Sequence, residues 1–530
     1  MHLQPRVVQS ALLAATTSVN APLSSEAPEG AVQAPSNFVG FGFETAFIND
    51  YTNEFTLNLL ESIAERLGTA PTIRIGGTSG DRVLFDPSQD EVKVCIAGDC
   101  PIGSAATYIL GPSYFDGFSS FQDFDMTFQA PLGPTLNISN TLTYVSRAYK
   151  NVGKDRLAAI AIGNEPNLYP SQYGITYTVD QYVNDSKTVM SDVSNTLGLG
   201  KSRIFEVLDF ATRSPLFDLY VPFSQGLSMQ KMLIIFSSAD TFENNIDSSD
   251  NVKVAAWHYY QLGTDYTTTA QQQTYLMNHS AITSLVGSFT SQIEYLQAND
   301  PDVQFVLSET GSGTASSVEI QAGFGAALWC IDFQLYSLTQ GVSRIDATHR
   351  PAALHSYWVP DDSAGDTNPG PQVRGVWYAL PFIADFIGHN PGKVAEVDLG
   401  SDVLTAYAMY DRFTNRLAKV ALINLRTWVE GESTSDRGSE NVSIPISFGT
   451  FTYKVERLVS AAGAQAMGFD YGGPTENITW AGEQWSYSIG QGKGHLVPGI
   501  PTEETHIVTG GEVKVEVSDS EAVLVTFYGL

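Results

Sequence analysis

Short runs of apolar residues alternate with longer amphipathic segments between about residues 38 and 388. The short runs are typical of strands buried in a parallel sheet, and the longer segments, in which apolar residues recur every three or four positions, are typical of helices. The predicted strands are residues 38–44, 72–76, 124–129, 157–163, 204–210, 252–258, 303–308 and 344–348. The predicted helices include residues 53–67, 141–150, 179–197, 280–298 and 322–338.

This alternation predicts an α/β fold, a (β/α)8 TIM barrel over residues 38–390. A doubly wound open sheet is the alternative arrangement of the same elements. A nucleotide-binding sheet of that kind carries a glycine-rich loop after its first strand. No such loop follows residues 38–44, and the barrel is therefore the preferred prediction.

The pattern changes from about residue 391, where short segments of alternating apolar and polar residues are separated by Gly, Asn, Ser and Asp. This pattern predicts a C-terminal antiparallel β-sandwich domain over residues 391–530. Its predicted strands are residues 403–410, 416–424, 441–448, 453–459, 476–479, 513–517 and 522–528. The polar segment 22–37, which precedes the first barrel strand, is expected to join this sandwich.

Residues 1–21 resemble a secretory signal peptide, because Arg6 precedes the largely apolar residues 7–15 and Val19-Asn20-Ala21 resembles a cleavage site. No later apolar stretch has the length of a membrane span. N-glycosylation sequons begin at Asn137, Asn184, Asn278, Asn441 and Asn477. Chance is the alternative explanation for the sequons, since Asn, Ser and Thr are plentiful. Together these features favour a secreted, extracellular glycoprotein, which we expect to be a monomer.

The charge of the chain limits its partners. It has 57 Asp and Glu residues against 28 Lys and Arg, a formal net charge of −29 at pH 7. Nucleic acids and anionic membranes repel such a chain, and long sulfated polysaccharides need clustered cations that it lacks. Cys95 and Cys100 flank a short acidic turn and are candidates for a disulfide, whereas Cys330 is expected in a buried helix. The cysteines lack metal-ligand spacing, and no metal is predicted.

Two glutamates follow buried strands. Glu165 stands in the turn Asn164-Glu165-Pro166 after residues 157–163, and Glu309 follows residues 303–308. Catalytic groups of barrel enzymes sit at the C-terminal ends of the strands, so both carboxylates are expected at one rim. A retaining glycosidase needs two carboxyl groups about 5 Å apart. A helix-capping carboxylate is the alternative for either glutamate alone, but the pair favours catalysis.

Other residues are expected near this pair. Asn164 offers an amide donor for a sugar hydroxyl, or else it only shapes the turn. His258 and Tyr260 lie two residues apart and therefore point to the same side of the sixth strand. The Tyr260 hydroxyl is expected to hydrogen-bond the nucleophile and keep it ionised. Packing or stacking on a sugar ring is the alternative for these aromatic residues.

Three further segments are predicted to reach the same rim. Gly77 and Thr78, after the second strand, offer a close backbone approach and a hydroxyl. Glu44, after the first strand, is a candidate acceptor for a substrate hydroxyl, with helix capping as the alternative. His349, after the eighth strand, is expected either to line the mouth of the barrel or to lie on the surface.

Several motifs together resemble glycoside hydrolase family 79, which holds the β-glucuronidases and heparanases. The matching pieces are Ile73-Arg-Ile-Gly-Gly-Thr78, Leu84-Phe-Asp-Pro87, Ile162-Gly-Asn-Glu-Pro166, Trp257-His-Tyr-Tyr260, Leu307-Ser-Glu-Thr310 and Phe324-Gly-Ala-Ala-Leu-Trp329. The resemblance implies a (β/α)8 barrel with a β-sandwich, Glu165 as acid/base, Glu309 as nucleophile, retention of anomeric configuration and no cofactor.

One position departs from the family pattern. A Tyr followed by glycines, which binds the glucuronate carboxylate, is expected about five residues after the nucleophile, where this chain has Thr314, Ala315 and Ser316. The sequence therefore predicts a secreted, exo-acting retaining β-glycosidase, with small-aglycone or glycan β-glucuronides as the first substrate choice. A neutral sugar such as glucose or xylose is the alternative. An inactive carbohydrate-binding protein on the same scaffold is the alternative from another class.

Overall fold

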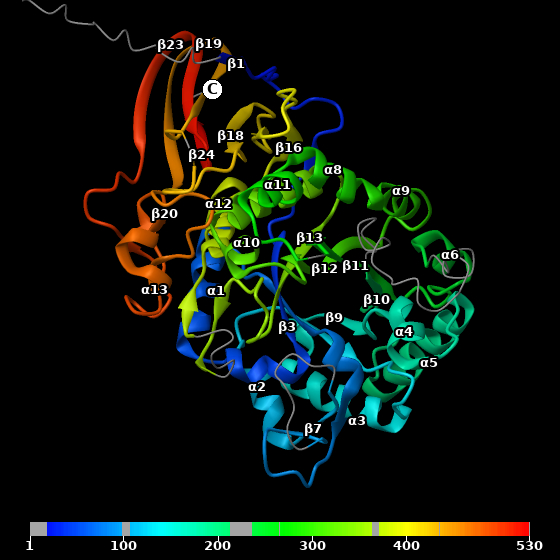
Figure 1. Ribbon diagram of the computed structural model, residues 1–530. Coiled ribbons are helices and arrows are strands. Elements are labelled where there is room, and N and C mark those ends of the chain that lie inside the picture. The colour runs from blue at the N-terminus through cyan, green and yellow to red at the C-terminus, as the bar shows by residue number, and fades with distance from the viewer. Residues whose placement is uncertain are drawn as a thin grey trace, which may run out of the picture.

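Eight parallel strands close into a barrel in the computed structural model, which describes residues 18–97, 106–211, 236–263, 265–362, 370–433 and 435–528. Each strand pairs with the next in the chain, and the last pairs with the first (Figure 1). They are β3 (Val39–Glu44), β4 (Thr72–Gly76), β8 (Met126–Ala130), β9 (Leu157–Ile162), β10 (Phe205–Ala211), β11 (Val252–Leu262), β12 (Gln304–Gly313) and β13 (Arg344–His349). The predicted TIM barrel is confirmed.

The first barrel strand shows how the sequence fills the two sides of the wall. Phe41 and Phe43 alternate with glycines along β3 and pack against His349 and Trp358. A Cβ atom on Gly40 would lie 1.9 Å from the Asp346 carboxylate. Glycine at this position therefore leaves room for a charged side chain inside the barrel, while the phenylalanines pack on the other side of the strand.

Helices follow the barrel strands and surround them (Figure 1). The longer ones are α1 (Glu54–Leu67), α3 (Ile138–Val152), α5 (Val179–Leu197), α8 (His279–Val286), α9 (Thr290–Asn299), α11 (Phe324–Thr339) and α12 (Ala379–Ile387). The predicted single helix over residues 280–298 is wrong, because a 3-10 turn at Gly287–Phe289 separates α8 from α9. Local capping fixes other boundaries: Thr178 and Gln181 form a capping box at the start of α5, and Gly198 ends that helix in a left-handed conformation.

Shorter elements lie between these. The short helices are α2 (Asp116–Ser119), α4 (Tyr169–Tyr173), α6 (Ser238–Glu243), α7 (Thr269–Tyr275), α10 (Val318–Ala322) and α13 (Phe469–Gly472). Two small sheets were not predicted: β5 (Val83–Phe85) with β7 (Tyr108–Leu110) and β6 (Lys93–Cys95), and β14 (Trp358–Val359) with β15 (Gln372–Val373). Their strands are too short to show a periodicity in the sequence.

Within the described residues, eleven strands form the sheet of a C-terminal β domain. They are β1 (Ser18–Asn20), β2 (Val32–Gln33), β16 (Lys393–Glu396), β17 (Leu404–Tyr410), β18 (Leu417–Asn424), β19 (Ser439–Ser460), β20 (Ile478–Trp480), β21 (Glu483–Gln484), β22 (His495–Leu496), β23 (Glu504–Ser518) and β24 (Glu521–Tyr528). The predicted strands 441–448 and 453–459 are one long strand, β19, which pairs with both β23 and β24. The sheet encloses its own hydrophobic core, built from β17, β18, β19, β23 and β24.

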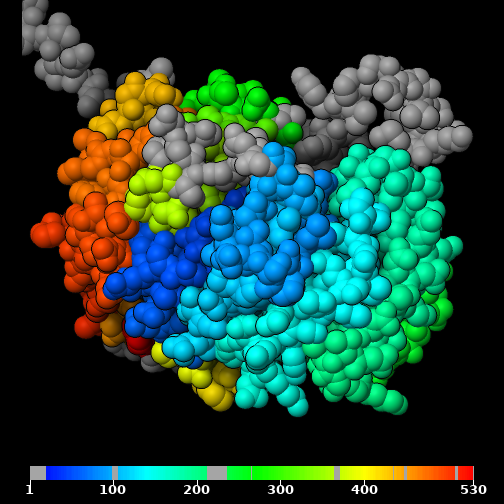
Figure 2. Space-filling view, turned by 90° about the horizontal axis from the view of Figure 1, so that it is seen from below, coloured from blue at the N-terminus to red at the C-terminus, as the bar shows by residue number. Residues whose placement is uncertain are grey.

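The β domain packs on one side of the barrel, beside its N-terminal part (Figure 2). The Trp485 indole donates a hydrogen bond to Ser62 of α1 at 3.2 Å, and Asn58 of α1 donates to the Gln491 carbonyl at 2.9 Å. α11 is buried almost all round, because it contacts the barrel as well as β16 and β18. Some residues of the β domain therefore belong to the hydrophobic core of the barrel, while others form the separate core of the sheet.

The N-terminal segment enters the β domain, and the described cysteines lie in different environments. Residues 7–15 of the predicted signal peptide and Cys100 lie outside the described residues, whereas Ser18–Asn20 form β1 and pair with β19. Ala21 is fully buried in the core of the β domain, so the predicted cleavage triplet is part of the fold in this structure. Cys95 is disulfide-bonded, and Cys330 is free and buried in α11. No helix in the described ranges is both long and apolar enough to span a membrane.

Candidate active site

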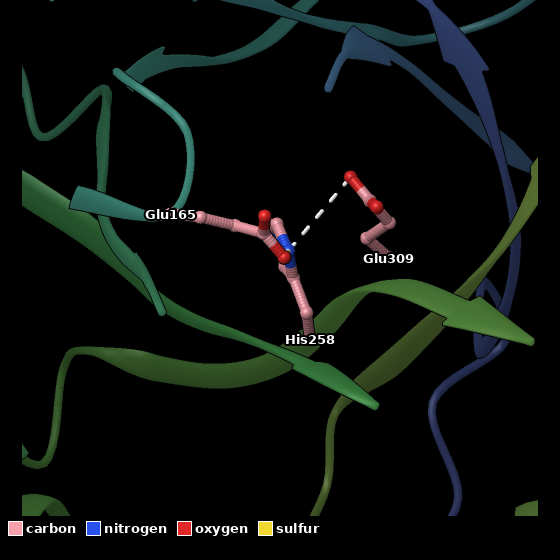
Figure 3. Close-up of side chains that lie close together, drawn as sticks. All are labelled: Glu165, His258 and Glu309. Atoms are coloured by element: carbon pink, nitrogen blue, oxygen red, sulfur yellow. Dashed lines mark hydrogen bonds and ion pairs between the residues drawn. The ribbon is translucent and has the colours of Figure 1, made fainter. Parts of the chain in front are cut away.

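Glu165 and Glu309 meet at the C-terminal rim of the barrel, together with His258 (Figure 3). One carboxylate oxygen of each glutamate and one ring nitrogen of His258 all lie within 4.8 Å of one another. Glu165 follows β9 and Glu309 lies on β12, with β10 and β11 between these strands in the barrel wall. The structure thus brings the two predicted catalytic residues together.

The strands that carry His258 and Glu309 are longer than predicted. β11 continues to Leu262 and β12 to Gly313, and the two strands pair from His258 opposite Glu309 to Leu262 opposite Gly313. The predicted ends at residues 258 and 308 are wrong because backbone pairing continues where the side chains become polar, and hydropathy does not reveal such pairing. Both side chains are therefore held on a rigid sheet rather than on a loop.

The turn that carries Glu165 is held in a strained conformation. Glu165 has a φ of 48°, in the left-handed region, and Pro166 begins a 3-10 turn directly after it. A left-handed conformation costs a non-glycine residue roughly 1–2 kcal/mol. The Glu165 N–H donates to the Asp209 carbonyl at 2.9 Å, and the Asn164 N–H donates to Asp81 Oδ2 at 2.9 Å. These hydrogen bonds oppose the strain and fix the direction of the carboxylate.

Asp81 organises this turn, although nothing in the sequence marked it. Its buried carboxylate accepts hydrogen bonds from Gln129 Nε2 at 2.9 Å, the Leu132 N–H at 2.8 Å, the Asn164 N–H and the Tyr169 hydroxyl. Burial raises the pKa of Asp81 above its ordinary value, and these donors oppose the rise. Asp81 follows the Gly77-Thr78 turn closely, and only the tertiary fold shows that it contacts the segment around residue 164.

Glu309 is surrounded by groups that favour its charged form. The Tyr260 hydroxyl donates to Glu309 Oε1 at 2.8 Å, Arg74 Nη1 lies 3.4 Å from Oε2, and His258 Nδ1 lies 3.8 Å from Oε2. Burial works to raise the pKa of Glu309, but His258, Arg74 and Tyr260 outweigh burial and hold this pKa below its ordinary value. Glu309 is therefore ionised, as a nucleophile must be.

His258 carries a positive charge between the carboxylates. Its Nδ1 lies 3.1 Å from Glu165 Oε1, and its Nε2 lies 3.4 Å from Asp209 Oδ1. Burial alone would lower the pKa of His258, but Glu309, Asp209 and Glu165 raise it to about 10. Both ring nitrogens then carry protons and donate to the enzyme's own carboxylates. His258 lines the cavity as predicted, and its charge acts on the catalytic pair.

Arg74 lies beneath this group and was missed by the sequence analysis. Its guanidinium, which is 2% exposed, lies 2.8 Å from Asp209 Oδ1, 3.2 Å from Asn164 Oδ1 and 3.6 Å from Glu206 Oε1. A signal was present, since an arginine inside a fully buried strand requires acidic partners. Asp209 itself is turned into the barrel by an irregularity of β10, where Leu208 and Asp209 have positive φ values.

Glu44 and Gly77 approach one another closely at the rim. The Ser79 N–H donates to Glu44 Oε1 at 2.5 Å, and a Cβ atom on Gly77 would lie 2.1 Å from Glu44 Oε2. Gly77 also has a φ of 99°, so glycine serves both the turn and the close contact. Burial, followed by the charge of Glu309, raises the pKa of Glu44 to about 7. Glu44 can therefore either donate to or accept from a sugar hydroxyl near neutral pH.

A cavity of about 780 Å³ opens above Glu165 and Glu309. The predicted residues that line it are Glu44, Thr78, Glu165, His258, Tyr260, Glu309 and Thr314. Asn164 lies 2% exposed beside it, and its Nδ2 has no hydrogen-bond partner among the described residues. The lining also contains Arg350 and His355, which the sequence analysis did not identify. Both stand in an irregular loop, where no hydrophobic pattern marks a residue as facing a cavity.

His349 does not line this cavity. Its ring is fully buried, and the centroids of the His349 and Trp358 rings lie 4.0 Å apart. Its Nδ1 donates to the Ala347 carbonyl at 2.8 Å. Burial lowers the pKa of His349 to about 3, so it is neutral. The predictions that it reaches the mouth or lies on the surface are both wrong, because it packs with Phe41, Phe43 and Trp358 in the hydrophobic layer.

A pair of carboxyl groups at the C-terminal rim of a (β/α)8 barrel that carries a β domain is typical of a glycoside hydrolase. Residues 406–524 match the glycosyl hydrolase family 79 C-terminal beta domain. A β-glucuronidase of Aspergillus niger is 26% identical over 99% of this chain and all of its own length. A β-glucuronidase of Neurospora crassa is 25% identical over 90% of this chain and 91% of its own.

The structure has a close counterpart as well. A 4-O-α-L-rhamnosyl-β-D-glucuronidase from Fusarium oxysporum superposes with a TM-score of 0.76, at 22% identity, over 96% of this chain and 100% of that one. The fold match and the full-length relatives agree with the β-domain match. Together these similarities support glycoside hydrolase family 79 for this chain.

Proposed function

We propose that this protein is an exo-acting β-glucuronidase that cleaves its substrate with retention of anomeric configuration. The observation that carries the mechanism is the separation of the carboxyl groups, since oxygens of Glu165 and Glu309 lie within 4.8 Å. Retaining enzymes hold their carboxyl groups about 5–5.5 Å apart, whereas inverting enzymes leave about 6.5–9.5 Å for a water molecule. The spacing supports direct attack by a carboxylate on the anomeric carbon.

In the first step Glu309 attacks the anomeric carbon while Glu165 gives its proton to the leaving glycosidic oxygen. A covalent glycosyl-enzyme forms, and the aglycone leaves as a neutral alcohol. In the second step Glu165 takes a proton from water, and the water oxygen displaces Glu309 from the sugar. Tyr260 and Arg74 stabilise the charge on Glu309 before the attack and after its release. Asn164 Nδ2, which has no hydrogen-bond partner among the described residues, is the proposed donor to a hydroxyl of the sugar.

The choice of glucuronides rests on the relatives. The two protein sequences above carry the name β-glucuronidase, and they align with nearly the whole chain. One observation favours a neutral sugar instead: Thr314, not Tyr, lines the cavity after the nucleophile. Hydrolysis of 4-nitrophenyl β-glucuronide, β-glucoside, β-xyloside and β-galactoside decides between these two functions. Preference for the glucuronide supports the proposal, and preference for a neutral glycoside contradicts it.

The variant Glu309→Gln tests the catalytic assignment. Activity should fall by several orders of magnitude, because an amide cannot act as the nucleophile. Glu294→Gln, on the exposed face of α9, is the matched control and should keep full activity. If Glu309→Gln keeps the thermal stability and activity of the wild type, the assignment is wrong. Saccharide binding without any wild-type hydrolysis would indicate the inactive carbohydrate-binding alternative.

The stereochemistry has its own test. Proton NMR of the first-formed sugar should show the β anomer, before mutarotation produces the α anomer. An initial α product would indicate inversion and contradict a glycosyl-enzyme on Glu309.

Secretion, glycosylation and a monomeric state are part of the proposal. Asn137 and Asn184, two of the sequon residues, are exposed on the surface. Expression in a eukaryotic host should therefore give a protein in the medium whose mass falls after enzymatic removal of N-glycans. Light scattering of that protein measures its oligomeric state.

A further inference from the structure

The cavity has an unequal distribution of charge that bears on substrate recognition. The acidic residues that line it are Glu44, Glu165, Asp265 and Glu309. Among the described lining residues, the cationic side chains are His258 and Arg350. His258 directs both ring nitrogens toward carboxylates of the enzyme. An anionic sugar that enters a cavity with these carboxyl groups is repelled unless a cation compensates its charge, and Arg350 is such a cation in the lining.

Arg350 stands next to the reacting centre. It directly follows β13, which lies between β12 and β3 in the barrel wall. The register pairs Thr310 with Ala347 on one side of β13 and Phe43 with His349 on the other. Arg350 therefore emerges between the strand that carries Glu309 and the strand that ends at Glu44. Burial is the main cause that raises the pKa of Glu44, and the charge of Arg350 acts against it.

The backbone of this loop is held firmly. The Ser356 hydroxyl accepts from the Arg350 N–H at 3.3 Å and donates to the Arg350 carbonyl at 2.9 Å. The buried Arg374 guanidinium donates to the carbonyls of Ala353, Leu354 and Ser356 at 3.1, 2.8 and 3.2 Å. A cation on a pre-organised loop loses little entropy when it binds a ligand.

His355 links this loop to the segment after the nucleophile. Its Nδ1 donates to the Gly313 carbonyl at 2.9 Å, and its ring packs edge-on against Tyr260 with centroids 5.3 Å apart. Burial lowers the pKa of His355 to about 4, so the ring is neutral above that pH. Its Nε2 is buried and has no partner among the described residues, which leaves an acceptor for a sugar hydroxyl beside Arg350.

Two backbone N–H groups of the loop after the nucleophile are already hydrogen-bonded within the protein. The Thr314 N–H donates to the Leu262 carbonyl, and the Ser316 N–H donates to Asp265 Oδ1, both at 3.1 Å. These two N–H groups are therefore not free to bind a carboxylate in place of the missing Tyr. A hydroxyl on Thr314 remains, but it carries no charge to balance a carboxylate.

We propose that Arg350 binds the carboxylate of the substrate's glucuronate ring and so determines the preference for an acidic sugar. The inference rests on the proposed β-glucuronidase function. The carboxylate of a glucuronide is attached to C5, which is joined to the anomeric carbon through the ring oxygen. When Glu309 faces the anomeric carbon, the carboxylate lies at the same end of the ring, where the loop of Arg350 lines the cavity. A guanidinium matches two carboxylate oxygens with parallel hydrogen bonds.

The test compares two substrates that differ at one group. Arg350→Gln, Arg350→Lys and wild type are assayed with 4-nitrophenyl β-glucuronide and with its methyl ester, which removes the charge. Arg350→Gln should lower kcat/KM for the glucuronide by about 10- to 100-fold, mainly through KM, as expected when a charge-assisted hydrogen bond is lost. The kcat/KM for the methyl ester should change less than about threefold, since the uncharged ester does not form the charge-assisted hydrogen bond in the wild type. Arg350→Lys should recover part of the loss.

Arg426→Gln is the control, because it removes one positive charge from a half-exposed site in the β domain. Arg426→Gln should leave kcat/KM unchanged for both substrates. Equal losses on both substrates in Arg350→Gln would overturn the proposal in favour of a structural role, as would an unchanged glucuronide rate. Wild-type enzyme that does not cleave the glucuronide refutes the proposed function itself, and this outcome is visible before any variant is measured.

Discussion

The hydrogen bond from Tyr260 to Glu309 offers the cleanest single perturbation of the active site. Tyr260→Phe removes one hydroxyl and keeps the ring, which packs against His355. The lost bond is 2.8 Å long and ends on Glu309 Oε1. Burial, followed by the charge of Glu309, raises the pKa of Tyr260 well above 10, so the hydroxyl is a donor throughout the working pH range. The substitution therefore changes the stabilisation of Glu309 and little else.

The expected change in the pKa of Glu309 follows from the energy of that hydrogen bond. A hydrogen bond to a charged group contributes about 1.5–3 kcal/mol. Each pKa unit corresponds to about 1.4 kcal/mol, so the pKa of Glu309 should rise by roughly one to two units. Burial opposes ionisation of Glu309, and its pKa is held low by His258, Arg74 and Tyr260. Loss of one of these groups raises that pKa, so protonation should disable the nucleophile at a higher pH than in the wild type.

The assay is the pH dependence of kcat/KM, which reports ionisations of the free enzyme. The acidic limb for Tyr260→Phe should move toward neutral pH by roughly one to two units, with kcat at the optimum reduced by about tenfold or more. Tyr453→Phe is the matched control, since Tyr453 stacks on His506 in the β domain, and its profile should match the wild type.

Two results would refute this reasoning. An acidic limb that stays in place would mean that the Tyr260 hydroxyl does not hold the charge on Glu309. A limb that moves to lower pH would mean that the sign of the interaction is wrong. A general loss of folding is recognised by thermal denaturation and cannot imitate a shifted limb.

Three further predictions concern the acid, the rim and the domain interface. Glu165→Gln should lower kcat by about 10²- to 10⁴-fold for a substrate with a poor leaving group, but much less for one that releases nitrophenolate, which needs no proton. Equal losses across a series of leaving groups would contradict the role of Glu165 as the acid. Gly77→Ala should destabilise the protein by about 1–3 kcal/mol, because its φ is 99° and its Cβ meets the Glu44 carboxylate, and an unchanged melting temperature would contradict this. His279 lies 2.9 Å from both Asp332 Oδ2 and Glu396 Oε1 between barrel and β domain; burial opposes its charge, but these carboxylates raise its pKa to about 10. Charged His279 therefore stabilises the folded protein fully below about pH 6.5, and this stabilisation is lost as pH rises through 10. The difference in melting temperature between wild type and His279→Gln should shrink over that range, and a constant difference would disprove the prediction.

The barrel was predictable because its information is local. Most barrel strands contain a short apolar run that a polar residue ends, as in residues 157–163 before Asn164 and Glu165. The meeting of Glu165 and Glu309 at one rim was predictable for the same reason, since each carboxylate directly follows an apolar run of a barrel strand. The ends of β11 and β12 were not predictable, because pairing between two strands far apart in the chain extends them.

The surroundings of the pair depend on contacts that no local pattern reports. Asp81 reaches Asn164, Arg74 reaches Asp209, and the irregularity of β10 turns Asp209 inward. His349 illustrates the opposite case, since a histidine after a barrel strand suggested the cavity and proved to lie in the hydrophobic layer.

The sequence by itself determined the fold class, the order of the strands and the position of two glutamates after barrel strands. Burial of a strand and its end both depend on residues that are neighbours in the chain. Only the tertiary structure decided which groups set the charge on Glu309 and which cationic side chains line the cavity. Those effects fall off steeply with distance between side chains. The distances between Arg74, His258, Tyr260, Arg350 and Glu309 exist only after the barrel has closed.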